Sequence, residues 1–414
     1  RTVVLTSLPN RDCVRRASTA GALVVGVNLD DKDELTALKL WRKVDRAYLL
    51  SGNIGANQKR AKSLETWLTS NAERGHTASG RRLPLVVRVD DPWLADEWRR
   101  RGIGDPYFAI DALAVYEETA DALVTLLLAA RGVRHLLTAG SGPLALALLA
   151  ELSQRGREQQ FVGEEQPLPE VTLIDLDAGH YLDDHHHRQQ RFVFDPLITH
   201  ATDEIPTIEE MTVAIDALLA AGVPEKDLAV VVAMDGTRLG TRLATRHRAM
   251  LVLEPVTGAA ELGTQPLFAN LRPYSLALNA PDAKAEDCWE RAAKAVHGRY
   301  QRRYEGAPLA VPWDELPREF YRQSNRRQIR TTLDSIRAIG RTWQTSGPED
   351  VRCDDKAMAD DRAPVRIAAG KELFGLSTLD LEKLAINEHQ SWMRHYRADG
   401  WTPGTDPLPP GQTA

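Results

Sequence analysis

The chain contains few cysteines and no long apolar run. Only three cysteines occur among its 414 residues, at positions 13, 288 and 353, and this odd, scattered set fits neither a disulfide framework nor a paired-cysteine metal site. The pattern favours a reducing, cytosolic environment. The longest apolar stretches, at 123–130 and 143–150, are eight residues long, whereas a membrane-spanning helix needs about twenty. The sequence therefore predicts that neither stretch crosses a bilayer.

The chain also lacks an excess of positive charge. Lys and Arg total 52 and Asp and Glu total 58, which gives a net charge of −6 at pH 7. General nucleic-acid binders carry the opposite imbalance, so we expect no nucleic-acid partner. The hydrophobic content of 43% is typical of a folded chain, and the length fits about two or three domains. The sequence starts at Arg1 without an apolar leader, which predicts no secretory signal and leaves room for a preceding segment.

Short β-rich runs alternate with helical patterns through the first two thirds of the chain, which is typical of parallel sheets with helices on their faces. The first section has predicted strands at 3–5, 22–29, 47–50, 85–89 and 107–110. The second section has them at 133–139, 171–176, 191–194, 228–234 and 249–253. Each section contains a strand that closes in aspartate, Asp30 or Asp175. We therefore predict an α/β fold class with two Rossmann-like parallel-sheet units, arising from a duplication.

The pattern becomes helical from about residue 285. Apolar residues recur at spacings of three and four, which predicts helices over about 289–300, 320–339 and 377–400. The predicted domains are a degenerate Rossmann-like unit at 1–131, a second unit at 132–283 and a mainly helical part at 284–414.

A glycine-rich turn follows the predicted strand at 133–139. Gly140, Ser141 and Gly142 begin a GxGxxA pattern that leads directly into a helical run. Glycines at the first two positions allow a tight turn and let a pyrophosphate approach the backbone N–H groups, and the helix dipole favours the anion. Asp175 and Asp177 end the next strand, where a carboxylate accepts hydrogen bonds from a ribose.

These five residues form the predicted nucleotide site. The separation from Gly140 to Asp175 is 35 residues, against about 20 in the usual pattern, and we attribute the excess to a polar loop at 156–170. The alternative is a degenerate fold that binds nothing and keeps its glycines for packing. The corresponding turn of the first section, at 6–10, has no glycine, and Pro9 removes an N–H group, so we expect a structural role there.

The run Asp183 to His187, DDHHH, is the only dense cluster of potential metal ligands in the sequence. Consecutive residues of an extended segment point alternately, and no partner motif accompanies the run, so we expect a solvated loop and no metal. The sequence shows no recognisable catalytic constellation, so we expect no enzymatic activity.

Three segments carry a family resemblance over about residues 1–280: PLVVRVDDPWLADEWRRRGI at 84–103, LVLEP at 251–255 and NAPDAKAEDCWERAAKAVHGRY at 279–300. With the two α/β units, they resemble the TrkA-N or RCK type of Rossmann domain, which regulates potassium channels and transporters. The resemblance implies that Gly140, Ser141, Gly142 and Asp175 bind NAD, ATP or a related nucleotide, and that binding changes the angle between paired lobes. The first section departs from the family pattern because its turn lacks glycines.

Two C-terminal segments carry a second resemblance: VPWDELPREFYRQSNRRQIRTTLDSIRAIG at 311–340 and LEKLAINEHQSWMRHYRADGWTPG at 381–404. They look like the RyR domain, a module named from ryanodine receptors and also present in bacterial proteins. The resemblance implies that this module binds a small, nucleotide-like ligand.

Glu388 and Trp392 lie four residues apart, on one predicted helical face with Leu381, Leu384 and Tyr396. A carboxylate within an apolar stripe needs a partner, and we expect it to be Arg326. One interpretation is a structural ion pair under an aromatic lid. The other is a ligand pocket in which aromatic faces stack on a base, lined by Asn325, Arg326, Glu388, His389, Trp392 and Trp401.

The sequence thus favours a ligand-sensing regulatory protein at the cytoplasmic side of a membrane. Its expected ligand is NAD(H) or an adenine nucleotide, and its expected partner is a potassium channel or transporter, either upstream in the same protein or on another chain. By resemblance, we expect a homodimer or a larger oligomer. Two alternatives stay open: an NAD(P)-dependent oxidoreductase that uses the Gly140 turn, although no Tyr-x-x-x-Lys pair follows it, and a scaffold that binds only proteins.

Overall fold

The computed structural model describes residues 2–37, 44, 46–70, 83–101, 108–130, 132–163, 166–190, 197, 199–234, 238–256, 266–276, 288–338 and 377–398. The chain divides into two compact units, Arg1–Val115 and Tyr116–Ala414, which we call unit 1 and unit 2. The division into domains at 1–131, 132–283 and 284–414 stays a prediction.

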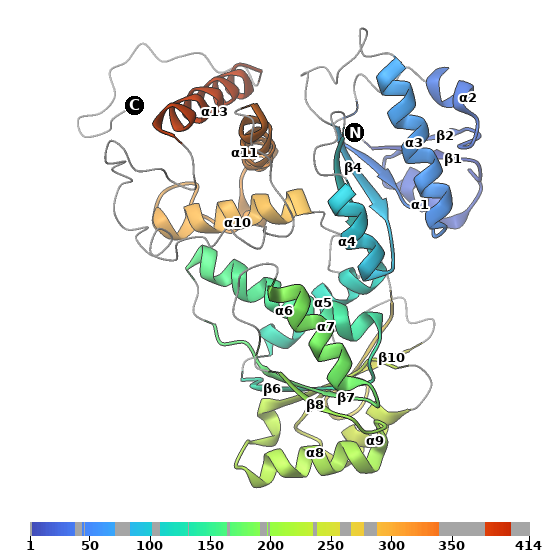
Figure 1. The fold of residues 1–414 in the computed structure, drawn as a ribbon, viewed down its shortest axis with the longest axis vertical. Helices are drawn as coiled ribbons and strands as arrows, with labels where there is room; N and C mark the ends of the chain where they lie inside the picture. The colour runs from blue at the N-terminus through green and yellow to red at the C-terminus, as the bar shows by residue number, and fades with distance from the viewer. Residues whose placement is uncertain are drawn as a thin grey trace. The chain divides into compact units, whose positions relative to one another are not determined.

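Unit 1 is an α/β unit with parallel strands (Figure 1). Strands β1 and β2 pair in one sheet, and β3, β4 and β5 pair in that order in another. A buried apolar cluster lies between the second sheet and helix α3 and includes Leu64, Leu85 and Phe108. The elements are β1 Val3–Thr6, α1 Asp12–Thr19, β2 Leu23–Gly26, α2 Lys32–Ala37, β3 Ala47–Leu49, α3 Ile54–Ser70, β4 Leu83–Arg88, α4 Pro92–Arg101 and β5 Phe108–Leu113.

Unit 2 contains a six-stranded parallel sheet in the order β8-β7-β6-β9-β10-β11. This is the strand order of the dinucleotide-binding Rossmann fold. The elements are α5 Val115–Ala129, β6 His135–Ala139, α6 Pro143–Val162, β7 Glu170–Ile174, α7 Ala178–Gln190, β8 Thr199–Thr202, α8 Ile208–Ala220, η2 Glu225–Asp227, β9 Leu228–Val232, α9 Leu239–Arg246, β10 Leu251–Pro255 and β11 Leu271–Tyr274.

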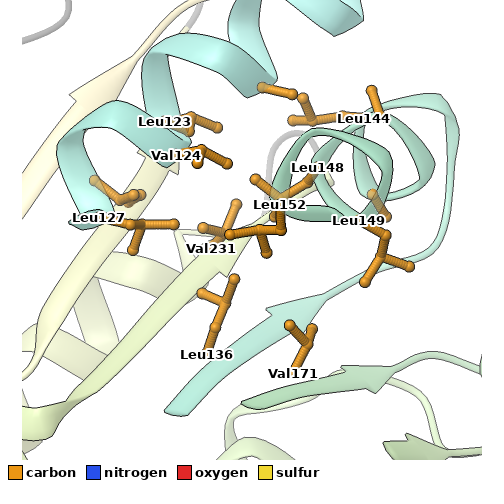
Figure 2. Close-up of a cluster of buried hydrophobic side chains, with 14 of the residues drawn as sticks. Leu123, Val124, Leu127, Leu136, Leu144, Leu148, Leu149, Leu152, Val171 and Val231 are labelled. Carbon is orange, nitrogen blue, oxygen red and sulfur yellow. The ribbon is translucent and has the colours of Figure 1, made fainter. Parts of the chain in front are cut away.

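Apolar side chains cover both faces of this sheet, as a parallel sheet requires. Helices α5, α6 and α7 pack on one face, and α8 and α9 pack on the other. Figure 2 shows leucines of α5 and α6 converging on Leu136, Val171 and Val231 of the sheet. The continuous apolar strands of the sequence are therefore explained by burial on both faces.

The helical part of unit 2 consists of α10 Cys288–Arg303, η3 Trp313–Glu315, α11 Glu319–Ala338 and α13 Thr378–Ala398. These elements confirm the three helices predicted after residue 285. Helix α10 packs against both α6 and α11, and α11 packs against α13. A buried hydrogen bond of 2.8 Å joins the hydroxyls of Thr331 on α11 and Ser391 on α13. The predicted fold class, parallel-sheet α/β units followed by a helical module, is confirmed.

Two of the strands in the six-stranded sheet were not predicted from the sequence. The missed strands, β8 and β11, are the two edges of the six-stranded sheet. Their sequences, THAT and LRPY, lack an apolar run, and a proline within a strand is typical of an edge. The strand predicted at 191–194 lies outside the described residues.

The acidic and histidine-rich run at 183–187 forms part of helix α7, so the predicted solvated loop is wrong. Ala178, Leu182, His185 and Gln189 recur at helical spacing, and all are buried. Two of these four are polar, which is why hydropathy did not reveal the buried face. Among the described residues, no group of three or more His, Cys, Asp or Glu side chains is placed to hold a metal ion.

No helix within the described ranges is both long enough and apolar enough to span a membrane.

Candidate functional site

The glycine-rich turn of unit 2 lies where the connections of the sheet change direction. They run from β6 through β7 to β8 on one side and from β9 through β10 to β11 on the other, and β6 pairs directly with β9. In open parallel sheets, ligands bind in the crevice at this position, outside the carboxyl ends of the strands. Gly140 directly follows β6, and Pro143 starts α6. The predicted turn therefore occupies the position at which this fold binds ligands.

Gly140 and Gly142 contribute differently to the turn. Gly140 has a φ of 98°, which L side chains rarely adopt, and a Cβ there would come within 3.2 Å of Met234 Cβ. Gly142 is extended, and a Cβ placed on it would meet no atom of the described chain within 4 Å. Gly140 is thus required for the shape of the turn, whereas Gly142 leaves open space before the helix.

Asp175 holds the turn in place. Ser141 donates hydrogen bonds to Asp175 Oδ2 from its N–H group and its hydroxyl, at 2.5 and 2.6 Å, and the Leu176 N–H donates to Oδ1 at 2.8 Å. Burial acts to raise the pKa of Asp175, but these hydrogen bonds outweigh it and lower the pKa below its ordinary value. The structure therefore joins two of the predicted residues, Ser141 and Asp175, and it gives Asp175 a positioning role.

We expect Asp175→Asn to lower the thermal midpoint at pH 7, because a neutral amide oxygen accepts these hydrogen bonds less strongly than a carboxylate. A carboxyl group whose pKa is lowered by folding stabilises the protein above its unfolded pKa of about 3.9, and this contribution disappears as the pH falls through the folded pKa. The difference between wild type and variant should therefore narrow below about pH 4. Asp177→Asn, at an exposed position, is the matched control. Differential scanning fluorimetry at several pH values measures the midpoints, and a pH-independent difference would contradict the assignment.

Two strand-end carboxylates at the same edge were not predicted. Asp203, after β8, accepts a hydrogen bond of 2.8 Å from the Gly179 N–H at the start of α7. Glu254, in β10, accepts hydrogen bonds from Gly240 and Thr241 at the start of α9. Each pair joins elements that meet only in the folded sheet, so local spacing gave no signal for it. The protein's own carboxylates thus satisfy N–H groups at the starts of α7 and α9.

Asp177 is exposed and directly precedes α7. The long separation between Gly140 and Asp175 arises mainly from α6, which continues to Val162. The predicted polar loop at 156–170 is therefore wrong over 156–162. Within this segment, Glu158 pairs with Arg291 on α10, and Arg157 donates hydrogen bonds to Gln154 and Gln189.

Charged side chains join α6 to α10. Arg291 on α10 donates to both carboxylate oxygens of Glu151 on α6, at 2.7 and 2.8 Å, and it also pairs with Glu158. Arg155 pairs with Glu151 and with Asp121 on α5. Burial raises the pKa of Glu151 although Arg291 opposes this effect. The Glu151 side chain is only 9% exposed, so this network between α6 and α10 is centred on a buried carboxyl group.

In the helical part, the expected partner of Glu388 is wrong by one residue. Arg327 Nη2 lies 2.8 Å from Glu388 Oε1, and the Arg327 side chain is 5% exposed. Arg326 instead pairs with Glu290 on α10 and with Glu319, and the hydrogen bond to Glu290 raises the pKa of Arg326. Successive residues of a helix point about 100° apart. Consequently the two arginines face different helices.

The other residues of the predicted helical pocket lie on α11 and α13. Asn325 donates a hydrogen bond to the Tyr321 carbonyl one turn earlier on α11. The ring centroids of His389 and Trp392 lie 6.1 Å apart, and those of Trp392 and Tyr396 lie 4.2 Å apart. Trp401 lies outside the described residues. The structure thus places Glu388, His389 and Trp392 along α13, while Arg326 points to α10.

Comparisons with known proteins add one similarity. No family model and no curated protein matches the chain. Among solved structures, the crystal structure of GsuK bound to ADP is similar, with 16% sequence identity and a TM-score of 0.29. The similarity covers 62% of this chain and 54% of that one, so the chain spans about half of its length. The Rossmann-type fold is shown by the strand order of unit 2, whereas the RCK and RyR assignments stay predictions. We therefore argue function from the geometry of the site.

Proposed function

We propose that this chain is a nucleotide-responsive regulatory protein, with its ligand site at the carboxyl edge of the unit 2 sheet. The observation that carries the proposal is the turn between β6 and α6. It lies at the change of direction in a sheet with Rossmann strand order, and Gly142 leaves open space directly before a 20-residue helix. The N-terminus of a helix favours anions, so phosphate groups are the chemistry that this position suits.

The regulated partner in this proposal is a potassium channel or transporter, in the same protein or on another chain. The sequence resemblance to RCK domains supports it, and the segment at 84–103 that carries part of this resemblance covers α4 and all of β4 except its first residue. The proposal assigns the chain no catalytic step and places it at the cytoplasmic face of a membrane. We expect potassium uptake by cells that produce the whole protein to differ from that of cells producing Gly142→Asp, and equal uptake would contradict this part of the proposal.

A thermal-shift screen of the purified protein against NAD, NADH, ATP, ADP and AMP tests ligand binding. A ligand present at about one hundred times its dissociation constant stabilises the protein by roughly 2.7 kcal/mol, which raises the melting temperature measurably. Gly142→Asp should abolish the shift, because its carboxylate would stand in the open space and repel phosphate. The backbone at Gly142 is extended, so any residue can adopt it, and the variant should fold.

Two further variants control this experiment. In Gly142→Asn, the new side chain has nearly the same shape as aspartate but carries no charge. This variant should therefore retain more of the ligand-induced rise in melting temperature than Gly142→Asp. Trp392→Ala alters a side chain on α13 that is 39% exposed, and it should leave the shift unchanged. A shift abolished by Trp392→Ala would assign the ligand to the helical part instead. If no nucleotide shifts the melting temperature, the proposed nucleotide-responsive function is contradicted. That result would favour the alternative of a scaffold that binds only proteins.

A further inference from the structure

At the carboxyl edge of the unit 2 sheet, the turn leaves open space at Gly142, whereas the edge on the β10 side is filled. On the β10 side, a Cβ added to Gly240 would come within 2.8 Å of Glu254 Cβ. The Glu254 carboxylate accepts hydrogen bonds from the Gly240 N–H at 2.9 Å, from the Thr241 N–H at 3.0 Å and from the Thr241 hydroxyl at 2.9 Å. This buried side chain, with its hydrogen bonds made to the start of α9, lies at the carboxyl end of β10.

Met234 lies between the two sides. It follows β9, and its Cβ and Cγ lie 3.2 and 3.5 Å from the position that a Cβ on Gly140 would take. A dinucleotide bound to a Rossmann sheet crosses the crevice where the strand order reverses, with its pyrophosphate at the first turn. In this chain that first turn contains Gly140, which Met234 approaches, and Glu254 lies beyond Met234 at the end of β10.

We propose that the site accepts a nucleotide with a single nucleoside and discriminates against dinucleotides. This inference rests on the proposed function and narrows its ligand class. Phosphates occupy the open space at Gly142, Met234 hinders the path of a second nucleoside, and Glu254 fills the far side. Displacing Glu254 would leave three hydrogen-bond donors without their acceptor, which adds to the discrimination.

Isothermal titration of the whole protein with ADP and with NAD tests the inference. NAD contains the ADP unit, with its terminal phosphate esterified to a second ribose that carries nicotinamide, so the two probes differ at that phosphate and in the part beyond it. We expect wild type to bind ADP more tightly than NAD by about tenfold or more. Met234→Ala should strengthen NAD binding by about threefold or more and leave ADP binding within about twofold. Leu267→Ala, at a side chain that is 70% exposed, is the control and should change neither affinity.

The outcomes separate the two proposals. Equal affinity of wild type for ADP and NAD would overturn the discrimination but support nucleotide binding. The role of Met234 would be overturned if Met234→Ala kept the wild-type preference for ADP over NAD. This conclusion requires that the variant has the wild-type melting temperature. Binding of neither probe would overturn the proposed function, and this inference with it.

Discussion

Replacing Arg291 with methionine should lower the free energy of unfolding of residues 116–414 by about 3 kcal/mol, near the lower end of the range for breaking a buried ion pair. The variant leaves the Glu151 carboxylate, 9% exposed, without its two-pronged partner, and Glu158 also loses an ion pair. Arg155 still contacts Glu151, and Arg291 is 25% exposed, so the loss should be limited. Urea unfolding monitored by tryptophan fluorescence measures it.

This loss should shrink as the pH falls from about 8 towards 5. Burial raises the pKa of Glu151, and removing Arg291 should raise it further. A carboxyl group with a raised pKa destabilises the fold above its unfolded pKa of about 4.3, and protonation relieves this effect as the pH falls. Glu158 acts in the same direction, because its lowered pKa in the wild type depends on Arg291.

Two variants accompany Arg291→Met. Adding Glu151→Gln to it should restore part of the stability at pH 8, because the unpaired charge is removed. Arg134→Met breaks the pair with Asp227 at an arginine that is 72% exposed, and it should cost less than about 1 kcal/mol. A pH-independent loss, or one no larger than that of Arg134→Met, would show that the network does not join the helical part to the sheet.

The second large effect is expected from Leu148→Ala, which removes a fully buried side chain between α6 and the sheet (Figure 2). Removal of three buried carbon atoms and incomplete closure of the resulting cavity should lower the free energy of unfolding by about 2–5 kcal/mol. A loss of about 3 kcal/mol corresponds to a melting temperature lower by roughly 6–12 °C.

Val213→Ala on α8 is the control for this variant. Its side chain is 63% exposed, so the melting temperature should change little, by an amount equivalent to about 0.5 kcal/mol or less. Similar losses in the two variants would mean that Leu148 is not part of a closely packed core. Helix α6 begins at the glycine-rich turn, so nucleotide binding there requires the folded protein. We therefore expect Leu148→Ala to reduce any nucleotide binding in proportion to the decrease in the fraction of folded molecules.

Local sequence patterns predicted much of the fold. Alternation of apolar runs with helical spacing indicated the parallel α/β units, and spacings of three and four indicated α10, α11 and α13. These patterns work because the side-chain period of a strand or helix is a property of the local backbone. The prediction was wrong where polar residues occupy buried or paired positions. His185 and Gln189 on the buried face of α7 are one example, and the charged end of α6 is another.

The sequence alone determined the turn itself. Gly140, Ser141 and Gly142 follow a buried strand and precede a long helix, and the positive φ of Gly140 is a local requirement that glycine meets. It could not determine which groups meet at that turn. Asp175 bonds to Ser141, Met234 approaches Gly140 and Glu254 bonds to the start of α9 because parallel strands bring their carboxyl ends to one edge.

The tertiary structure likewise decided that Arg327, rather than Arg326, pairs with Glu388. Adjacent residues on a helix differ by about 100° in direction, so the rotation of α11 against α10 and α13 selects the partner of each arginine. That rotation is fixed by packing among three helices that are distant in sequence, such as the contact of Thr331 with Ser391. Periodicity along the chain thus determines which elements form, whereas packing between distant elements determines which side chains meet.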